Sequence, residues 1–295
     1  MPGVVLPVAR VTGGPPATVP ASAELLDIAV TAARQAGEFL LAGRSVDLVI
    51  ETKSSPTDVV TQMDTAAERL IATAIAARRP TDDLLGEEGS GAAVSSSLRP
   101  APVDADAGGS SVRWIVDPLD GTVNYLYDLP HWAVSIAAER DGVVVAGAVF
   151  DPSKNEMFTA EIGGGAYLNG RPIRVSACAE LGLALVGTGF GYDAGRRARQ
   201  AEVVRSVLPI VRDIRRLGAA SLDLCALACG RLDGYFERGL NLWDHAAGGL
   251  IAAEAGARVE GLAGTAASTA FVVAAPRTLF PALHDLLAGL GADRV

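Results

Sequence analysis

Residues 113–125 of this chain read RWIVDPLDGTVNY, an apolar run that ends in two carboxylates and a glycine. The apolar residues predict a strand that brings Asp117 and Asp120 to its end. Pro118 biases Asp117 toward an extended backbone, and Gly121 permits a tight turn or the close approach of a ligand. The segment therefore predicts that two acids and their backbone converge at one strand end.

Two interpretations of this strand end are open. The two carboxylates and the Leu119 carbonyl are hard oxygen donors, which suit Mg²⁺. The N–H groups of Gly121 and Thr122, if they begin a short helix, suit a phosphate. Metal and phosphate together indicate phosphoryl chemistry, whereas Asp-Pro-x-Asp-Gly is also common in ordinary surface turns. The segment alone does not decide between the two.

Acidic residues recur at predicted strand ends and helix starts elsewhere in the chain. They are Asp64, Glu87, Glu88 and Asp244. If four carboxylates converged within about 6 Å, each pair would repel by roughly 3 kcal/mol at an effective dielectric constant near 20. Bound cations would offset this repulsion. Alternatively, the acids do not converge, and each is a separate solvated residue or a charge at a helix N-terminus. A metal centre is therefore a hypothesis that no single acid establishes.

Composition restricts the class of protein. The 295 residues, of which 49% are hydrophobic, predict one large domain or two intimate subdomains. A net charge of −9 argues against a primary nucleic-acid or anionic-membrane surface. Cys225 and Cys229 lie in an apolar run, which favours buried packing in a reducing compartment. No apolar run of eighteen residues and no signal-like N-terminus is present, so we expect a cytoplasmic protein without a membrane partner.

Hydrophobic periodicity predicts the elements of the N-terminal half. Residues 1–20 lack periodicity and predict a disordered leader before a single domain over 21–295. Helices are expected from Ser22 to about Leu40 and from the end of the 53–61 loop to just before Pro80. The expected strands cover residues 82–89, 113–120, 132–139, 143–150 and 156–160, with a hairpin at Asn169-Gly170 and a flexible excursion at 89–111.

The C-terminal half has a different pattern, in which strands and helices alternate. Strands are expected at 183–186 and 211–216, and helices at 195–208, 219–230 and 244–255. We therefore expect an α+β subdomain over 21–175, whose strands from 113 to 175 are antiparallel, and an α/β subdomain over 176–295.

Three segments, 86–88, 114–124 and 243–247, resemble in order and spacing the signature segments of the inositol monophosphatase family. The loop 53–64 is also similar, and the resemblance extends from about residue 25 to about residue 260. It implies a layered α-β-α-β-α fold of the α/β (α+β) class, usually as a homodimer. It also implies Mg²⁺-dependent hydrolysis of small phosphate monoesters, with lithium sensitivity in many members.

The resemblance further implies a role for each matching position. Two to three Mg²⁺ ions would be held by five residues, with Asp117 as the bridge: Glu87, Asp117, Leu119, Asp120 and Asp244. Asp64 and Thr122 would orient or deprotonate the attacking water, and Glu87 would support that catalytic step through a third ion. Substrate contacts would come from Gly121, Thr122, Ala219, Ala220, Glu237 and Asp244. Lys53 would lie in a mobile loop beside the active site.

The expected activity is a phosphoric monoester hydrolase that acts in inositol metabolism. It would convert myo-inositol monophosphate to inositol and phosphate without a covalent intermediate. The same chemistry on fructose 1,6-bisphosphate, histidinol phosphate or a 3′-phosphonucleotide is the nearest alternative. An aspartyl-phosphate enzyme is a weaker rival, because Asp117 and Asp120 are spaced Asp-x-x-Asp rather than Asp-x-Asp. A non-catalytic binding role in transcription is the alternative from another class.

Overall fold

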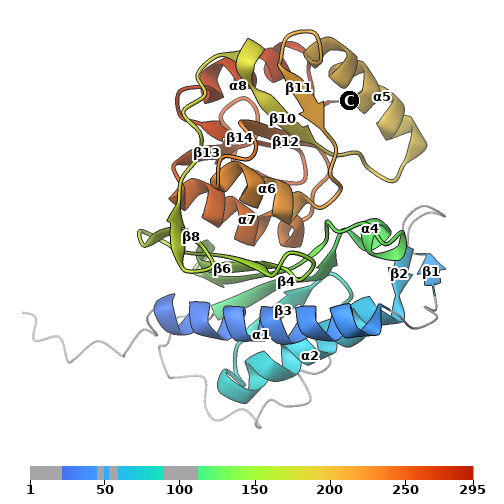
Figure 1. Cartoon of the computed structure of the whole chain (residues 1–295), viewed down its shortest axis with the longest axis vertical. Helices are drawn as coiled ribbons and strands as arrows, with labels where there is room; N and C mark the ends of the chain where they lie inside the picture. Colours follow the sequence, from blue (N-terminus) through green and yellow to red (C-terminus); the bar gives the residue numbers. More distant parts are fainter. Residues whose placement is uncertain (1–21, 45–49, 53–58, 90–111, 295) are drawn as a thin grey trace, which may run out of the picture.

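Two long helices form the first layer of the structure, a computed structural model that describes residues 22–44, 50–52, 59–89 and 112–294 (Figure 1). Helix α1 covers Ser22–Gly43 and α2 covers Gln62–Arg78. The predicted periodicity of α1 is confirmed, since Leu25, Ile28 and Leu40 are fully or almost fully buried. The predicted leader, Lys53 and nearly all of the 89–111 excursion lie outside the described residues.

A seven-stranded sheet packs against these two helices, in the order β3-β4-β5-β6-β7-β8-β9. Its strands are β3 (Asp83–Gly86), β4 (Val112–Asp120), β5 (Ala133–Arg140), β6 (Val143–Asp151), β7 (Glu156–Glu161), β8 (Gly165–Leu168) and β9 (Arg171–Ile173). The predicted hairpin at Asn169-Gly170 joins β8 to β9. The antiparallel pairing expected over 113–175 is confirmed from β4 to β9. Strand β3, whose pairing was not predicted, is parallel to β4.

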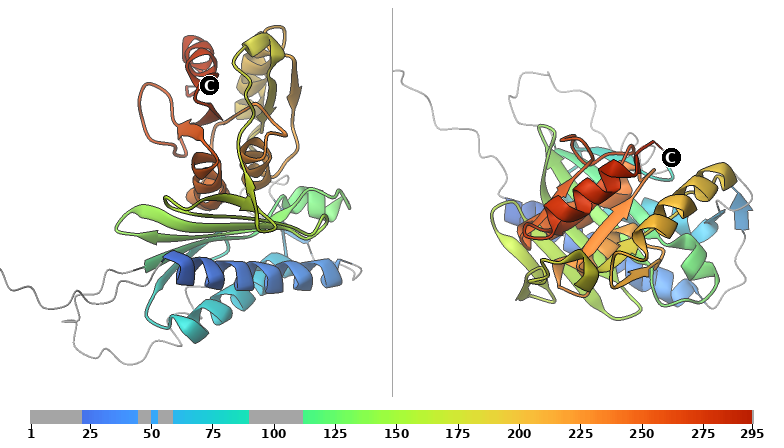
Figure 2. Two further views of the ribbon diagram at one scale, coloured as in Figure 1. Left: turned by 60° about the vertical axis from the view of Figure 1, so that its left-hand side comes forward. Right: turned by 90° about the horizontal axis from the view of Figure 1, so that it is seen from above.

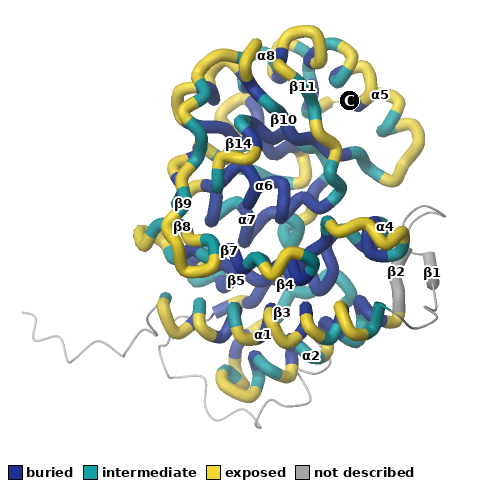
Figure 3. The backbone as a smooth tube through the Cα atoms, in the orientation of Figure 1, coloured by how far each residue is buried: buried dark blue, intermediate teal, exposed yellow. Residues whose placement is uncertain are grey.

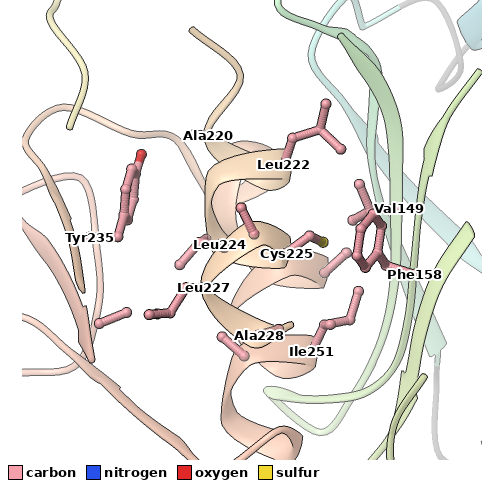
Figure 4. Close-up of a cluster of buried hydrophobic side chains, with 14 of the residues drawn as sticks. Val149, Phe158, Ala220, Leu222, Leu224, Cys225, Leu227, Ala228, Tyr235 and Ile251 are labelled. Atoms are coloured by element: carbon pink, nitrogen blue, oxygen red, sulfur yellow. The ribbon is translucent and has the colours of Figure 1, made fainter. Parts of the chain in front are cut away.

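The middle layer consists of α6 (Ala220–Ala228) and α7 (Leu242–Glu254), which lie between two sheets (Figure 2). Val149 and Phe158 of the seven-stranded sheet face α6 and α7, and Tyr235 lies on the opposite side (Figure 4). Of the two cysteines predicted to be buried, Cys225 is buried, whereas Cys229 at the C-terminal end of α6 is only partly buried. Contacts on both sides explain why every residue of α6 is buried.

The second sheet has five strands in the order β11-β10-β12-β14-β13. They are β10 (Leu185–Thr188), β11 (Asp213–Arg215), β12 (Gly234–Glu237), β13 (Ala257–Glu260) and β14 (Val272–Pro276). A short 3₁₀ turn, η1 (Leu181–Leu183), precedes β10. Strands β11, β10 and β12 are parallel, and β14 is antiparallel to both of its neighbours.

Helices α5 (Ala194–Val207) and α8 (Phe280–Gly289) cover the outer face of the five-stranded sheet and complete the last layer. The inner helices α6 and α7 are mostly buried, whereas the outer helices α1, α5 and α8 each expose one side (Figure 3). The predicted α-β-α-β-α layering and the α/β class are confirmed. The division into subdomains at residue 175 stays a prediction.

Several elements were not anticipated from the sequence. The antiparallel pair β1 (Ile50–Thr52) and β2 (Val59–Thr61) flanks the expected loop. Strands β12, β13 and β14 and helix α8 were also missed. The missed strands are short, with four, four and five residues, so they carry little periodic signal of their own. No helix in the described part of the chain combines the length and apolarity that crossing a membrane requires.

Tyr125 ties the short helix α4 (Thr122–Leu126) to α1. Its hydroxyl donates a 2.7 Å hydrogen bond to the Leu40 carbonyl, and both residues are buried. Its ring meets Trp132 edge-on, with 5.0 Å between the ring centroids. These contacts fix the segment that follows Asp120 against the first helical layer.

We predict that Tyr125→Phe lowers the free energy of unfolding by about 1–2 kcal/mol, because the buried Leu40 carbonyl loses its partner. Urea unfolding followed by circular dichroism measures this change. Tyr127→Phe is the matched control, because Tyr127 is 76% exposed, and it is expected to leave stability unchanged. Equal effects of the two substitutions would contradict the prediction.

Candidate functional site

A cleft that is open to solvent gathers ten of the twelve predicted site residues along its wall. They are Glu87, Asp117, Leu119, Asp120, Gly121, Thr122, Ala219, Ala220, Glu237 and Asp244. Asp64 lies behind this wall and contacts Thr122. Lys53 is outside the described residues. Residues as far apart in the chain as Glu87 and Asp244 therefore meet at one place.

An irregularity in β4 brings Asp117 and Asp120 to the same side of the sheet. Residues three apart in a regular strand point to opposite faces. Here Asp117 pairs with Ser135 and Asp120 pairs with Ala133, so three steps along β4 match two along β5. Pro118 lies in this bulge, where its missing N–H interrupts no regular ladder. The extra residue aligns the two carboxylates with the cleft.

Gly121 makes the turn from β4 into α4 possible. Its φ of 88° and ψ of 36° lie in the left-handed region. A Cβ at this position would lie 3.0 Å from the His131 carbonyl oxygen and 3.2 Å from Cβ of Ala219. Glycine is therefore required both for the backbone angle and for the close approach of Ala219. The short helix that Gly121 and Thr122 were expected to begin is present as α4.

Ser221 holds one of the two aspartates, although the sequence did not single it out. Its N–H and its Oγ–H both donate to Oδ2 of Asp120, at 2.8 Å and 2.5 Å. Ser221 is fully buried in the first turn of α6. This contact links the seven-stranded sheet to the middle helix layer and fixes the orientation of the Asp120 carboxylate.

Two further contacts place the remaining acids. The Asn241 N–H donates to Oδ2 of Asp244 at 2.6 Å at the start of α7. The buried Glu68, another residue that sequence reasoning missed, accepts the Glu88 N–H at 2.7 Å through Oε2. A Cβ on Gly86 would collide with the Glu68 carboxylate, so Gly86 makes room for it. Glu68 thereby fixes the backbone that carries Glu87.

Burial and mutual repulsion make the charged forms of these acids unfavourable in the metal-free protein. Burial, followed by the charges of Glu87, Asp120 and Asp244, raises the pKa of Asp117 well above its usual range. Burial, followed by the charges of Asp120 and Glu87, likewise raises the pKa of Asp244 well above its usual range. Burial raises the pKa of Asp120 to about 6, although the Ser221 hydrogen bonds oppose the shift. A bound cation would remove the repulsion.

The donor set fits a hard divalent cation. Asp117, Asp120 and Asp244 each have one oxygen engaged by a protein N–H or O–H group. The second oxygen of each aspartate forms no hydrogen bond within the described ranges. All three aspartates line the cleft, and so does Leu119. No three acids there are already closed around a common point. Carboxylates that repel each other stay apart until a cation draws them together.

Thr122 and Asp64 form a hydrogen-bonded pair beside the acids. The Thr122 hydroxyl lies 3.1 Å from Oδ1 of Asp64 and 3.0 Å from the Leu119 carbonyl oxygen. One hydrogen can serve only one of these acceptors at a time, and the lone pairs of the hydroxyl oxygen can accept from a water in the cleft. The pair can therefore pass a proton from water toward a buried carboxylate.

Glu237 lies across the cleft at the end of β12. The Tyr235 hydroxyl donates to its Oε2 at 2.6 Å. Burial raises the pKa of Glu237 to about 7, while the Tyr235 hydrogen bond acts in the opposite direction. A Cβ on Gly189 would overlap the Glu237 carboxylate, so this glycine leaves space for it. A carboxylate held this way can accept hydrogen bonds from ligand hydroxyl groups.

Comparison with known proteins agrees with this arrangement. The profile of the inositol monophosphatase family matches residues 21–293. The inositol-1-monophosphatase SuhB of Mycobacterium tuberculosis is 50% identical over 218 residues, which are 72% of each chain. The Nus factor SuhB of Pseudomonas aeruginosa is 39% identical over 245 residues, which are 82% of this chain and 86% of that protein.

A solved structure shows the same architecture. The crystal structure of the extragenic suppressor protein suhB of Bartonella henselae superposes with a TM-score of 0.79 at 35% sequence identity. The match covers 90% of this chain and 98% of that one.

We predict that stabilisation by Mg²⁺ increases as the pH rises from 5 to 8. The raised pKa values of Asp117, Asp120 and Asp244 mean that the folded protein binds protons at these groups more tightly than the unfolded chain does. Protonation therefore stabilises the folded state at low pH, and this stabilisation is lost as the pH rises through the folded-state pKa, which is about 6 for Asp120. Mg²⁺ binds the ionised carboxylates, so the difference in Tm between Mg²⁺ and EDTA should be larger at pH 8.

Thermal unfolding at both pH values measures this difference. Asp120→Asn should reduce the Mg²⁺-dependent shift in Tm at pH 8. Asp285→Asn should preserve it, because Asp285 is an exposed residue of α8. A shift that is equal at the two pH values, or that survives in Asp120→Asn, would show that these acids do not form the metal site.

Proposed function

Because the chain belongs to the inositol monophosphatase family, we propose that it is a Mg²⁺-dependent phosphatase that hydrolyses myo-inositol monophosphate to inositol and phosphate. The convergence of Glu87, Asp117, Asp120 and Asp244 on one cleft supports this proposal most directly. Fructose 1,6-bisphosphate, histidinol phosphate and 3′-phosphonucleotides are alternative substrates of the same reaction. A cytoplasmic homodimer is the expected form.

The acids supply the electrostatic part of the reaction. Glu87, Asp117 and the Leu119 carbonyl would hold one Mg²⁺, and Asp117, Asp120 and Asp244 would hold a second. When bound, the ions would lower the pKa of the attacking water and neutralise charge on the phosphate and the leaving alkoxide. Glu87 would also contribute to a weaker third site.

The remaining residues bind the substrate and move a proton. The Thr122 hydroxyl, backed by Asp64, would accept a hydrogen bond from the attacking water and orient it toward phosphorus. The N–H groups of Gly121 and Thr122, at the start of α4, would contact the phosphate oxygens. Ala219, Ala220 and Glu237 line the part of the cleft that would receive the polyol, with Glu237 accepting its hydroxyl hydrogens. Lys53 would lie in a loop next to this site.

We predict that Asp117→Asn lowers Mg²⁺-dependent phosphate release by about 100-fold or more, because a neutral amide cannot supply the negative charge with which Asp117 would hold the ions. The assay uses myo-inositol 1-phosphate, fructose 1,6-bisphosphate, histidinol phosphate and adenosine 3′,5′-bisphosphate, with Mg²⁺ or with EDTA. Asp285→Asn should behave like the wild type. If the wild type with Mg²⁺ released phosphate from none of the four, the proposed activity would be wrong.

A second prediction concerns the hydroxyl of Thr122. Thr122→Val keeps the shape of the side chain but removes the oxygen, so kcat should fall by about 10²–10⁴-fold with little change in KM. Thr122→Ser keeps the hydroxyl and should retain most of kcat. Steady-state kinetics on the best substrate separates the two parameters. A loss shared equally by Thr122→Val and Thr122→Ser would point to packing instead of proton transfer.

Relatives called Nus factor SuhB in Pseudomonas aeruginosa and Vibrio cholerae, each 39% identical, favour a second candidate, a binding role in transcription. The Asp117→Asn variant also separates the two roles. Rescue of a deletion strain by this inactive variant would favour binding, whereas failure to rescue would favour catalysis.

A further inference from the structure

One oxygen of Asp120 is fully occupied by Ser221. Oδ2 of Asp120 accepts the Ser221 N–H at 2.8 Å and the Ser221 hydroxyl at 2.5 Å. A carboxylate oxygen has about two lone-pair positions, so both positions on this oxygen are taken. Oδ1 has no hydrogen-bond partner among the described residues. It is therefore the oxygen through which Asp120 can bind a cation.

The other two aspartates of the cleft are held less completely. In the described part of the chain, Oδ1 of Asp117 accepts one hydrogen bond, from the Leu119 N–H at 3.0 Å. Oδ2 of Asp244 also accepts one, from the Asn241 N–H at 2.6 Å. Each of these oxygens keeps a lone-pair position. Backbone N–H groups contact all three aspartates, so the serine hydroxyl is the additional donor that closes one oxygen.

Packing fixes Ser221 in this position. It is fully buried in the first turn of α6, and α6 itself is covered on both sides (Figure 4). A Cβ on Gly248 would lie only 2.9 Å from the Ser221 carbonyl oxygen, so α7 passes close to the same turn. The N–H groups of a first helical turn have no partner within the helix. Release of Asp120 would therefore leave buried donors of Ser221 without a partner.

Binding through one oxygen suits some cations better than others. Mg²⁺ takes six ligands in a nearly regular octahedron at about 2.0–2.1 Å, and the two oxygens of one carboxylate are too close together to fit neighbouring positions of it well. Ca²⁺ takes six to eight ligands at about 2.3–2.6 Å, which can include both oxygens of a carboxylate. An aspartate limited to one oxygen therefore serves Mg²⁺ fully but withholds a ligand from Ca²⁺.

We propose that the Ser221 hydroxyl restricts Asp120 to binding through one oxygen, and that it thereby makes the cleft discriminate against Ca²⁺ in favour of Mg²⁺. Ser221 is then a specificity-determining residue for the metal, and it acts through Asp120 without touching the cation or the substrate. The inference rests on the proposed function only in that the acids of the cleft hold the cation. It does not depend on which ester is hydrolysed.

Calorimetric titration of the metal-free protein with Mg²⁺ and, separately, with Ca²⁺ tests this role. Ser221→Ala keeps the backbone N–H but removes the hydroxyl, so Oδ2 of Asp120 regains a lone-pair position for Ca²⁺. The ratio of the Kd for Ca²⁺ to the Kd for Mg²⁺ should fall by about 10-fold. The ratio isolates the proposed effect, because a change that weakens both ions alike cancels.

Ser206→Ala is the matched control. The Ser206 hydroxyl donates to the Glu202 carbonyl at 3.1 Å within α5, and Ser206 does not line the cleft. This variant should leave the ratio unchanged. If Ser221→Ala does not unfold cooperatively in EDTA, Ser221→Cys replaces it, because a thiol keeps the size of the side chain but is a weak donor.

Two results overturn the role of Ser221. One is an unchanged ratio in the variant that lacks the hydroxyl, and the other is an equal fall of the ratio in Ser206→Ala. If the wild type binds neither ion, the metal site and the proposed function fail together with this role. If the wild type binds Mg²⁺ but releases no phosphate from any ester, the proposed activity fails separately, and the two titrations still decide about Ser221.

Discussion

Repulsion between buried carboxylates is the constraint on which the arrangement of this cleft depends. Asp117 and Asp120 end a strand of one sheet, Glu87 follows its parallel neighbour, and Asp244 begins a helix of the middle layer. Burial and their neighbours raise the pKa values of Asp117 and Asp244. The apolar packing of α6 and α7 between the two sheets opposes this repulsion, because separating the acids would expose that core to water.

The protein orients the acids without using up their ligand capacity. A hydrogen bond from Ser221, Asn241 or the Leu119 N–H holds one oxygen of each aspartate, and the other oxygen has no hydrogen-bond partner among the described residues. Such bonds reduce the rotational freedom that cation binding would otherwise have to remove. The same logic applies to Glu237, which Tyr235 holds from behind. Fixed supports around charged groups are typical of sites that must bind and react in one geometry.

The parts of the fold and site that local sequence encodes could be predicted. Helix α1 follows from its apolar spacing, and the strand end at Asp117 and Asp120 follows from an apolar run that stops at Pro118 and Gly121. The layers and the convergence of distant acids came from the resemblance of several segments to one family. The roles assigned to Glu87, Asp64 and the other site residues stay predictions.

Contacts that depend on packing could not be predicted. Ser221 lies 101 residues from Asp120, and nothing in its neighbouring sequence indicates a carboxylate partner. Strands β3 and β4 pair in parallel, and the periodicity of neither strand indicates which direction its neighbour runs. The Arg196 side chain passes Gly191 and reaches Gly239, a course that depends on three segments at once. Short strands such as β12 were missed because four residues rarely show a period.

The extra residue in β4 also limits how this protein can change during evolution. Each residue added to or removed from a strand reverses the direction of every side chain beyond it. A deletion between Asp117 and Asp120 would restore the regular pairing with β5 but would change which side chains enter the cleft. A substitution at Leu119 or Pro118 keeps this register. A change of length would turn the side chains beyond it to the opposite face of the sheet, so that different residues would line the cleft. We therefore expect descendants of this chain to vary in the composition of this segment long before they vary in its length.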